Sequence, residues 1–88
     1  MNVAFLPTAW EDYRHWQEHD PKLVDNFHAL IEECRRAPFK GTGKPEPLGG
    51  NLSGWSSRPI SHEHRLVYRV TGSGGAQTLQ VAQCRYLY

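Results

Sequence analysis

Residues 43–69 read GKPEPLGGNLSGWSSRPISHEHRLVYR, and this stretch passes from an irregular loop into a regular strand. The loop holds a single carboxylate, Glu46, between Pro45 and Pro47. Because proline restricts the backbone, the two rings stiffen the loop and fix the direction in which the carboxylate points. Long loops in a small domain are usually functional or disordered, and the stiffening favours a functional role for 39–50.

The end of this stretch, residues 64–70, alternates between polar and apolar side chains, as a half-buried β-strand does. One face of that strand would carry its larger apolar residues, Leu66, Tyr68 and Val70. The opposite face would carry Arg65 and Arg69 beside the small apolar Val67. An acid on a stiff loop and two arginines on one strand face together indicate a site for an anionic substrate.

The chain has 88 residues, which predicts a single domain, 1–88, with a modest core. No apolar run approaches the roughly 20 residues of a membrane span, and the N-terminus lacks the build of a signal peptide. We therefore expect a cytoplasmic protein that is not attached to a membrane. Cys34 and Cys84 are isolated and lack metal-ligand spacing, which predicts reduced, partly buried thiols and neither a disulfide nor a metal site.

The net charge is only +1, but the charges are unevenly distributed. Residues 1–33 carry two basic and seven acidic side chains, whereas residues 34–88 carry eight basic and two acidic ones. The basic part contains the candidate site, so a polyanion is the expected partner. The plain alternative is a solvated basic face that binds no ligand.

Two helices are expected before the loop. The sequence Thr8-Ala-Trp-Glu11 matches a capping box, which predicts that the first helix begins at Thr8. Three aromatic residues at three-residue spacing would form its core-facing side: Trp10, Tyr13 and Trp16. The second helix should begin at Asp20-Pro21, because Asp can cap a helix and Pro tolerates the first helical position.

The second helix should end before Pro38, and its apolar residues recur at helical spacing: Leu23, Val24, Phe27, Leu30, Ile31 and Cys34. Strands are expected near 2–6, 54–60, 64–70 and 77–86. Pro59 would place 54–60 at an edge or a bulge. The order βααβββ, with a possible extra short strand, predicts an α+β fold in which two N-terminal helices pack on one face of a mostly antiparallel sheet. The uncovered face would then be the working surface.

Four motifs now stand in a specific order: Gly43-Lys-Pro-Glu-Pro-Leu48, Asn51-Leu-Ser-Gly54, Glu63-His-Arg-Leu-Val-Tyr68 and Cys84-Arg-Tyr86. Together they closely resemble the YoeB (Txe/YoeB) toxins, ribosome-dependent mRNA endonucleases of the RelE superfamily. The likeness covers nearly the whole chain. It implies a microbial-ribonuclease-like fold, a toxin homodimer and a YefM-like antitoxin that wraps the toxin.

In such toxins a glutamate, an arginine and a histidine cut mRNA in the ribosomal A site without a metal or another cofactor. By resemblance, Glu46 is the general base for the ribose 2′-OH and Arg65 stabilises charge on the scissile phosphate. The resemblance and the basic charge of this half also suggest RNA contacts by Lys44, Arg58, Arg69 and Arg85. The plain alternative for Glu46 is a loop carboxylate paired with Lys44 or Arg65.

The chain departs from the family pattern at its end. Family members end Cys-Arg-Tyr-His-Tyr, with the histidine as general acid, whereas this chain ends Cys84-Arg-Tyr-Leu87-Tyr88. Leucine has no proton to give, and the phenol of Tyr88, with an ordinary pKa of about 10, is a weak donor at neutral pH. Natural divergence and a deliberate change would both explain the leucine.

Two further departures lie after Asn51-Leu-Ser-Gly54. An aromatic-plus-Trp pair is replaced by Trp55-Ser56, and a second arginine after Arg58 is replaced by Pro59. His62 and His64 are near the site in sequence, but no spacing argument places either at the leaving oxygen. Two functions therefore stay open: an RNA endonuclease, intact or impaired, and a toxin-fold module that binds ribosome and antitoxin without cutting.

Overall fold

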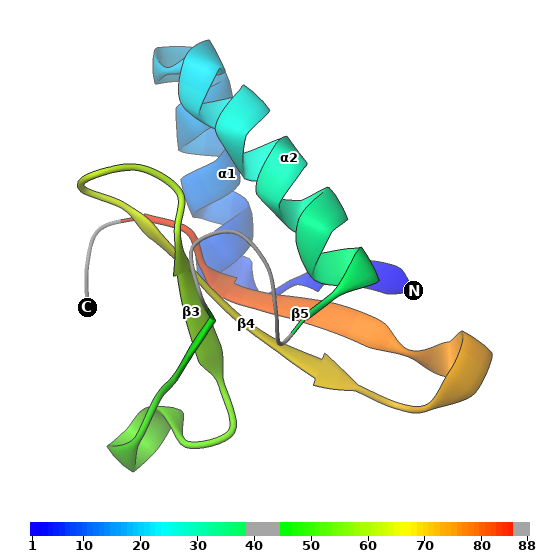
Figure 1. Ribbon diagram of the computed structural model, residues 1–88. Coiled ribbons are helices and arrows are strands. Elements are labelled where there is room, and N and C mark those ends of the chain that lie inside the picture. The colour runs from blue at the N-terminus through cyan, green and yellow to red at the C-terminus, as the bar shows by residue number, and fades with distance from the viewer. Residues whose placement is uncertain (39–44, 86–88) are drawn as a thin grey trace.

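A computed structural model describes residues 1–38 and 45–85 of the chain (Figure 1). The elements in order are β1 (Asn2–Phe5), α1 (Pro7–His19), α2 (Pro21–Arg36), β2 (Glu46–Pro47), β3 (Ser56–Pro59), β4 (Arg65–Thr71) and β5 (Thr78–Gln83). Short 3-10 turns lie at Gly50–Leu52 and Gly74–Ala76. Within the described residues, no helix combines the length and the apolar character that a membrane span requires.

The strands form one sheet in the order β1-β5-β4-β3-β2. β1 runs parallel to β5, and the other neighbours are antiparallel. Helices α1 and α2 lie side by side on one face of this sheet (Figure 1). The predicted α+β fold is confirmed, and the possible extra strand is β2, whose two residues pair with β3.

The core lies between the two helices and the sheet. Its buried apolar residues come from both layers: Ala9, Trp16, Leu23, Phe27, Leu30, Ile31, Cys34, Ile60, Leu66, Tyr68, Leu79, Val81 and Cys84. Both cysteines are buried free thiols. Burial raises the pKa of Cys34, and it raises the pKa of Cys84 to about 12. The expectation of buried thiols is thereby confirmed.

The first helix begins differently from the prediction, whereas the second begins as predicted. α1 starts at Pro7, with Leu6 as an N-cap that makes no side-chain bond, so the predicted capping box at Thr8 is wrong. Proline is favoured at the first helical position because its missing N–H needs no partner there, and this preference decides the start. At α2, Asp20 Oδ1 accepts a hydrogen bond from the Leu23 amide at 3.1 Å, as a capping Asp does.

The aromatic stripe of α1 is only partly in the core. Trp16 is buried and Tyr13 is half-buried, but Trp10 is 47% exposed. Trp10 instead lines an apolar groove of about 470 Å³ together with Phe5 and Tyr13. The expectation that all three aromatic residues belong to the core is wrong for Trp10, which lies in the first turn of α1 and packs against Phe5 of β1 at the side of the groove.

Candidate active site

Strand β4 divides its side chains between the two faces of the sheet as its alternation predicts. Leu66 and Tyr68 belong to the core beneath the helices. Arg65, Val67 and Arg69 therefore point to the face away from the helices. Val67 is nevertheless fully buried, so this face is covered by neighbouring side chains at the middle of the strand.

The face away from the helices brings together the predicted acid and the first arginine. Glu46 on β2 pairs with Ser57 on β3, which in turn pairs with Val67 on β4. An Nη2–H of Arg65 donates to Glu46 Oε2 at 3.2 Å, and the Nε–H of Arg65 donates to Ser57 Oγ at 2.6 Å. The prediction that Glu46 and Arg65 share this face is confirmed. The same contact is also the ion pair of the plain alternative.

The exposure of the two partners is unequal. The Arg65 side chain is 22% exposed, whereas that of Glu46 is 64% exposed. Because Arg65 is held at Nε by Ser57, its position is fixed by strand register and not by the ion pair alone. The carboxylate of Glu46 remains open to solvent and can accept a proton from a bound hydroxyl.

A second arginine lies farther along the same face. The guanidinium carbon of Arg69 is 4.4 Å from the ring centroid of Trp55, and its Nε–H donates to Gln80 Oε1 at 2.7 Å. Arg69 itself is exposed, as a residue that contacts RNA must be. The expected role of Arg69 in RNA binding is therefore compatible with its place.

Arg58 is not available for the RNA contact that was expected of it. Its side chain is fully buried, and its Nε–H donates to the Tyr68 hydroxyl at 3.0 Å. Its Nη2–H donates to the Ala37 carbonyl at 2.5 Å, and Tyr68 OH donates to the Pro38 carbonyl. Since Arg58 pairs with Leu66 in register, it points into the core and ties the end of α2 to the sheet.

Cys84, the residue after β5, is hydrogen-bonded to α1 through both its backbone carbonyl and its backbone amide. The indole Nε1–H of Trp16 donates to the Cys84 carbonyl at 3.1 Å, and the Cys84 amide donates to Asp12 Oδ2 at 3.2 Å. Arg85 follows directly, and its guanidinium carbon lies 5.6 Å from the Trp16 ring centroid. Arg85 is half-buried there. The helix therefore fixes the point from which the last residues of the chain continue.

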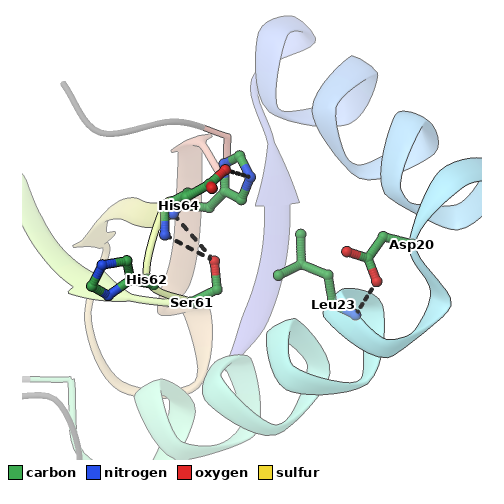
Figure 2. A pocket seen from close by; sticks show the side chains of 6 residues that line it. Asp20, Leu23, Ser61, His62 and His64 are labelled. Carbon is green, nitrogen blue, oxygen red and sulfur yellow. Dashed lines mark hydrogen bonds and ion pairs between the residues drawn. The ribbon is translucent and has the colours of Figure 1, made fainter.

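Three site residues of the sequence analysis, Lys44, Leu87 and Tyr88, lie outside the described residues. The two histidines that were weighed as substitutes for the general acid do lie within them. Figure 2 shows a pocket between Ser61 and His64 of the β3–β4 turn and Asp20 and Leu23 at the start of α2; His62 also lines it, whereas Glu46 and Arg65 do not.

His64 lies on the helix side of the sheet, because its ring packs against Trp16 with centroids 4.4 Å apart. Its parity along β4 is opposite to that of Arg65. His62 is exposed in the turn. His64 therefore does not project from the face that holds Glu46, and His62 lines a pocket to which neither Glu46 nor Arg65 contributes. Among the described residues, no group of three or more His, Cys, Asp or Glu side chains is arranged to hold a metal ion.

Comparison with known proteins shows which family the chain belongs to. Residues 5–88 match the family model described as "YoeB-like toxin of bacterial type II toxin-antitoxin system". The chain belongs to the YoeB toxin family. This is a family of ribonucleases, and the resemblance seen in the four sequence motifs is thereby confirmed.

Several YoeB relatives cover the whole chain. The curated protein "Toxin YoeB" of Escherichia coli (strain K12) is 49% identical, and the match spans 100% of both chains. The solved "YoeB/ParE toxin from Agrobacterium tumefaciens" is 48% identical with a TM-score of 0.95, again over 100% of both chains. A Staphylococcus aureus YoeB, solved as a dimer and in a heterotetrameric complex with YefM, is 42% identical with a TM-score of 0.87, over 100% of this chain and 98% of that one.

Two residues that support the arginines of the candidate site were missed by the sequence analysis. Ser57 holds Arg65, and Gln80 holds Arg69. A signal for Ser57 was present, because alternation along 56–60 puts Ser57 opposite in parity to Arg58 and Ile60, hence on the outward face. No comparable signal existed for Gln80, since its position opposite Arg69 depends on the register between β4 and β5.

Proposed function

We propose that this chain is the toxin of a type II toxin-antitoxin pair, a single domain that cuts mRNA in the ribosomal A site without a metal. The observation that carries the proposal is the contact between Glu46 and Arg65 at 3.2 Å on the face away from the helices. A carboxylate and a guanidinium at this separation can act on one ribose-phosphate unit. Membership in a ribonuclease family supports the same reaction.

In the proposed mechanism, Glu46 removes the proton of the ribose 2′-OH. The 2′-oxygen then attacks the adjacent phosphorus, and the bond from phosphorus to the 5′-oxygen breaks. A positioned carboxylate contributes about 10²–10⁴-fold as a general base. The proton taken by Glu46 comes from the nucleophile, so the leaving 5′-oxygen needs a proton from another source.

Arg65 is proposed to stabilise charge on the non-bridging phosphate oxygens. A guanidinium has five N–H donors in a planar fork. Within the described residues, Ser57 and Glu46 each take one of them, so three remain to meet the phosphate. Because Ser57 fixes Nε, the rest of the fork is oriented before the substrate arrives, which is the condition for effective electrostatic catalysis.

We further propose that cleavage by this chain is impaired, because Leu87 stands where the family has its general-acid histidine. Without that proton the 5′-oxygen leaves as an alkoxide. Lys44, Arg65, Arg69 and Arg85 retain positive charges for RNA, so binding should survive. The leucine also favours a second function, a non-cleaving module that binds ribosome and antitoxin.

The proposed partners are a YefM-like antitoxin, the ribosome with its mRNA, and a second copy of the chain. The Staphylococcus aureus relative, solved as a dimer and with YefM, supports the first and the last of these. The basic residues after 33 suit both an acidic antitoxin segment and RNA, which would compete. A monomer in light scattering at micromolar concentration would overturn the dimer.

The experiment that tests the site is Glu46→Gln in the Leu87→His background. Translation-coupled mRNA cleavage should fall about 10²–10⁴-fold, since the amide cannot take the 2′-OH proton. The matched control is Glu32→Gln on the surface of α2, where the carboxylate pairs with Arg35 and lies on the helix layer. Equal cleavage by the Glu46 and Glu32 variants would show that Glu46 is only an ion-pair partner of Arg65.

A further inference from the structure

We propose that Trp55 and Arg69 form a nucleobase-stacking subsite that holds a nucleotide of single-stranded RNA next to the cleaved linkage. The inference deepens the proposed function and rests on it in two respects, namely that the ligand is RNA and that the linkage to be cut lies at Arg65. The stack would run from the Trp55 indole through the Arg69 guanidinium to the base.

The Arg69 guanidinium is held in place by two neighbouring side chains, Trp55 and Gln80, and together they form a platform. The Arg69 guanidinium carbon lies 4.4 Å from the Trp55 ring centroid, and the bond from Nε–H to Gln80 Oε1 at 2.7 Å holds one edge of the guanidinium plane. Trp55 is half-buried, whereas Arg69 is exposed. The guanidinium is therefore the outer layer of the stack, fixed from beneath by the indole and from the side by Gln80.

The chemistry of this platform suits a base. Unpaired RNA bases stack on aromatic rings and on arginine guanidinium planes, largely independently of sequence. The positive charge also attracts the π-face of the base. Across residues 1–38 and 45–85, no carboxylate forms an ion pair with Arg69, unlike Arg65 with Glu46. The charge of Arg69 thus remains available to a polyanion.

The place of the platform fits a flanking nucleotide. Arg65 and Arg69 lie on the same face of β4, four residues apart. At the rise of a β-strand this separation is roughly 13 Å. When a scissile phosphate lies at Arg65, the platform meets the base of a neighbouring nucleotide, and stacking strength would make a purine the preferred base there.

The test uses nuclear magnetic resonance of the full chain with a short 2′-O-methyl RNA, which cannot be cut at its 2′-oxygen. A matched oligonucleotide carries abasic sites in place of its bases. We expect the Arg69 Nε–H and Trp55 indole resonances to shift with the first RNA, with the ring-current sign of a base above the guanidinium. Abasic RNA should bind roughly five- to a hundredfold more weakly and give no such ring-current shift.

Two variants separate stacking from charge. Arg69→Lys keeps the charge but has no plane, so it should lose the preference for base-containing RNA while still binding phosphate. Trp55→Leu leaves Arg69 unsupported and should weaken that preference. Arg14→Lys, at an exposed arginine of α1, is the control and should change nothing. Amide spectra of each variant check that the fold is intact.

The outcomes decide the proposal without a cleavage assay. Equal shifts and affinities for base-containing and abasic RNA would mean that Arg69 is only a phosphate contact, and the inference would be wrong. Shifts elsewhere with none at Trp55 and Arg69 would overturn it too. Failure of the Leu87→His protein to cut ribosome-bound mRNA would count against the proposed endonuclease alone, because the binding of free RNA is measured separately.

Discussion

The indole Nε1–H of Trp16 donates a hydrogen bond to the carbonyl of Cys84, 3.1 Å away. This bond joins the last turn of α1 to the residue that follows β5, directly before Arg85. The first helix therefore holds the backbone of Cys84 in place through side chains at two of its positions, Asp12 and Trp16.

Replacing Trp16 by Phe should destabilise the protein while keeping most of the packing. The ring is retained, but the buried Cys84 carbonyl loses its donor, which costs about 1–3 kcal/mol. Urea unfolding followed by circular dichroism measures this loss. The control is Trp10→Phe, an exposed tryptophan of the same helix, for which a change within about 0.5 kcal/mol is expected. Equal effects of the two changes would rule out a special role for the Trp16 bond.

Replacing Leu87 by His should increase mRNA cleavage. General acid help to the leaving 5′-oxygen is worth about 10²–10⁴-fold, or about 3–5 kcal/mol of barrier. Single-turnover cleavage of ribosome-bound mRNA gives the rate. Leu87→Asn, which is polar but has no acidic proton of suitable pKa, should stay slow. If the unchanged chain cuts as fast as Leu87→His, the proton comes from another group.

Replacing Arg58 by Met should reduce stability and leave RNA binding unchanged. The buried guanidinium donates to Tyr68 OH and to the Ala37 carbonyl, and bonds from a charged donor contribute about 1.5–3 kcal/mol each. The methionine variant no longer has to bury a charge, and this gain offsets part of the lost hydrogen-bond energy. We therefore expect the free energy of unfolding to fall by about 2–4 kcal/mol.

The salt dependence of ribosome binding distinguishes Arg58 from the arginines of the outward face. Each phosphate contact that is removed reduces the steepness with which affinity falls as salt rises. Arg69→Gln should reduce that slope by about 1, whereas Arg58→Met should leave it unchanged in protein that remains folded. A reduced slope for Arg58→Met would restore Arg58 as a phosphate contact.

The stability of the protein should fall with pH in alkaline solution, in part because of Cys84. Burial raises the pKa of this thiol from 9.0 to about 12. Above pH 9 the unfolded chain loses the thiol proton while the folded chain keeps it, so the unfolded state binds fewer protons and the free energy of unfolding decreases. Below pH 9 the protonated Cys84 thiol makes its full contribution to stability, and this contribution is lost as the pH rises toward 12.

Comparing the protein with its Cys84→Ala variant isolates this effect. The slope due to Cys84 approaches about 1.4 kcal/mol per pH unit. The variant should therefore lose less stability between pH 8 and pH 10 in urea unfolding, although its absolute stability is lower. Parallel curves for the two proteins would show that Cys84 titrates in the folded state as it does in the unfolded chain.

Much of the fold followed from periodicity. The apolar spacing of 23–34 predicted α2, and the alternation of 64–70 predicted both β4 and the outward direction of Arg65. The stiff loop and that direction placed Glu46 and Arg65 at one site on the outward face, whereas their ion pair was the plain alternative for Glu46. These signals are strong because they depend on contacts that repeat along a single element.

The errors arose where neighbouring elements compete for a residue. Thr8 had the pattern of a cap, but the fixed φ of Pro7 starts the helix one residue earlier. Arg58 was taken for a surface arginine by its charge, yet its register opposite Leu66 places it in the core. Arg58 donates to the Ala37 carbonyl at the end of α2 and to the Tyr68 hydroxyl, and no local sequence pattern reveals either partner.

The parallel pairing of Asn2–Phe5 with Thr78–Gln83 has a consequence for folding kinetics. Helices α1 and α2 depend on local contacts and can form early, but β1 has no neighbour until the last strand of the sheet is present. Closing so long a loop carries an entropy cost and gives the sheet a high contact order, which slows folding. During synthesis, a chain whose β5 has not yet emerged therefore lacks the strand that joins β1 to β4.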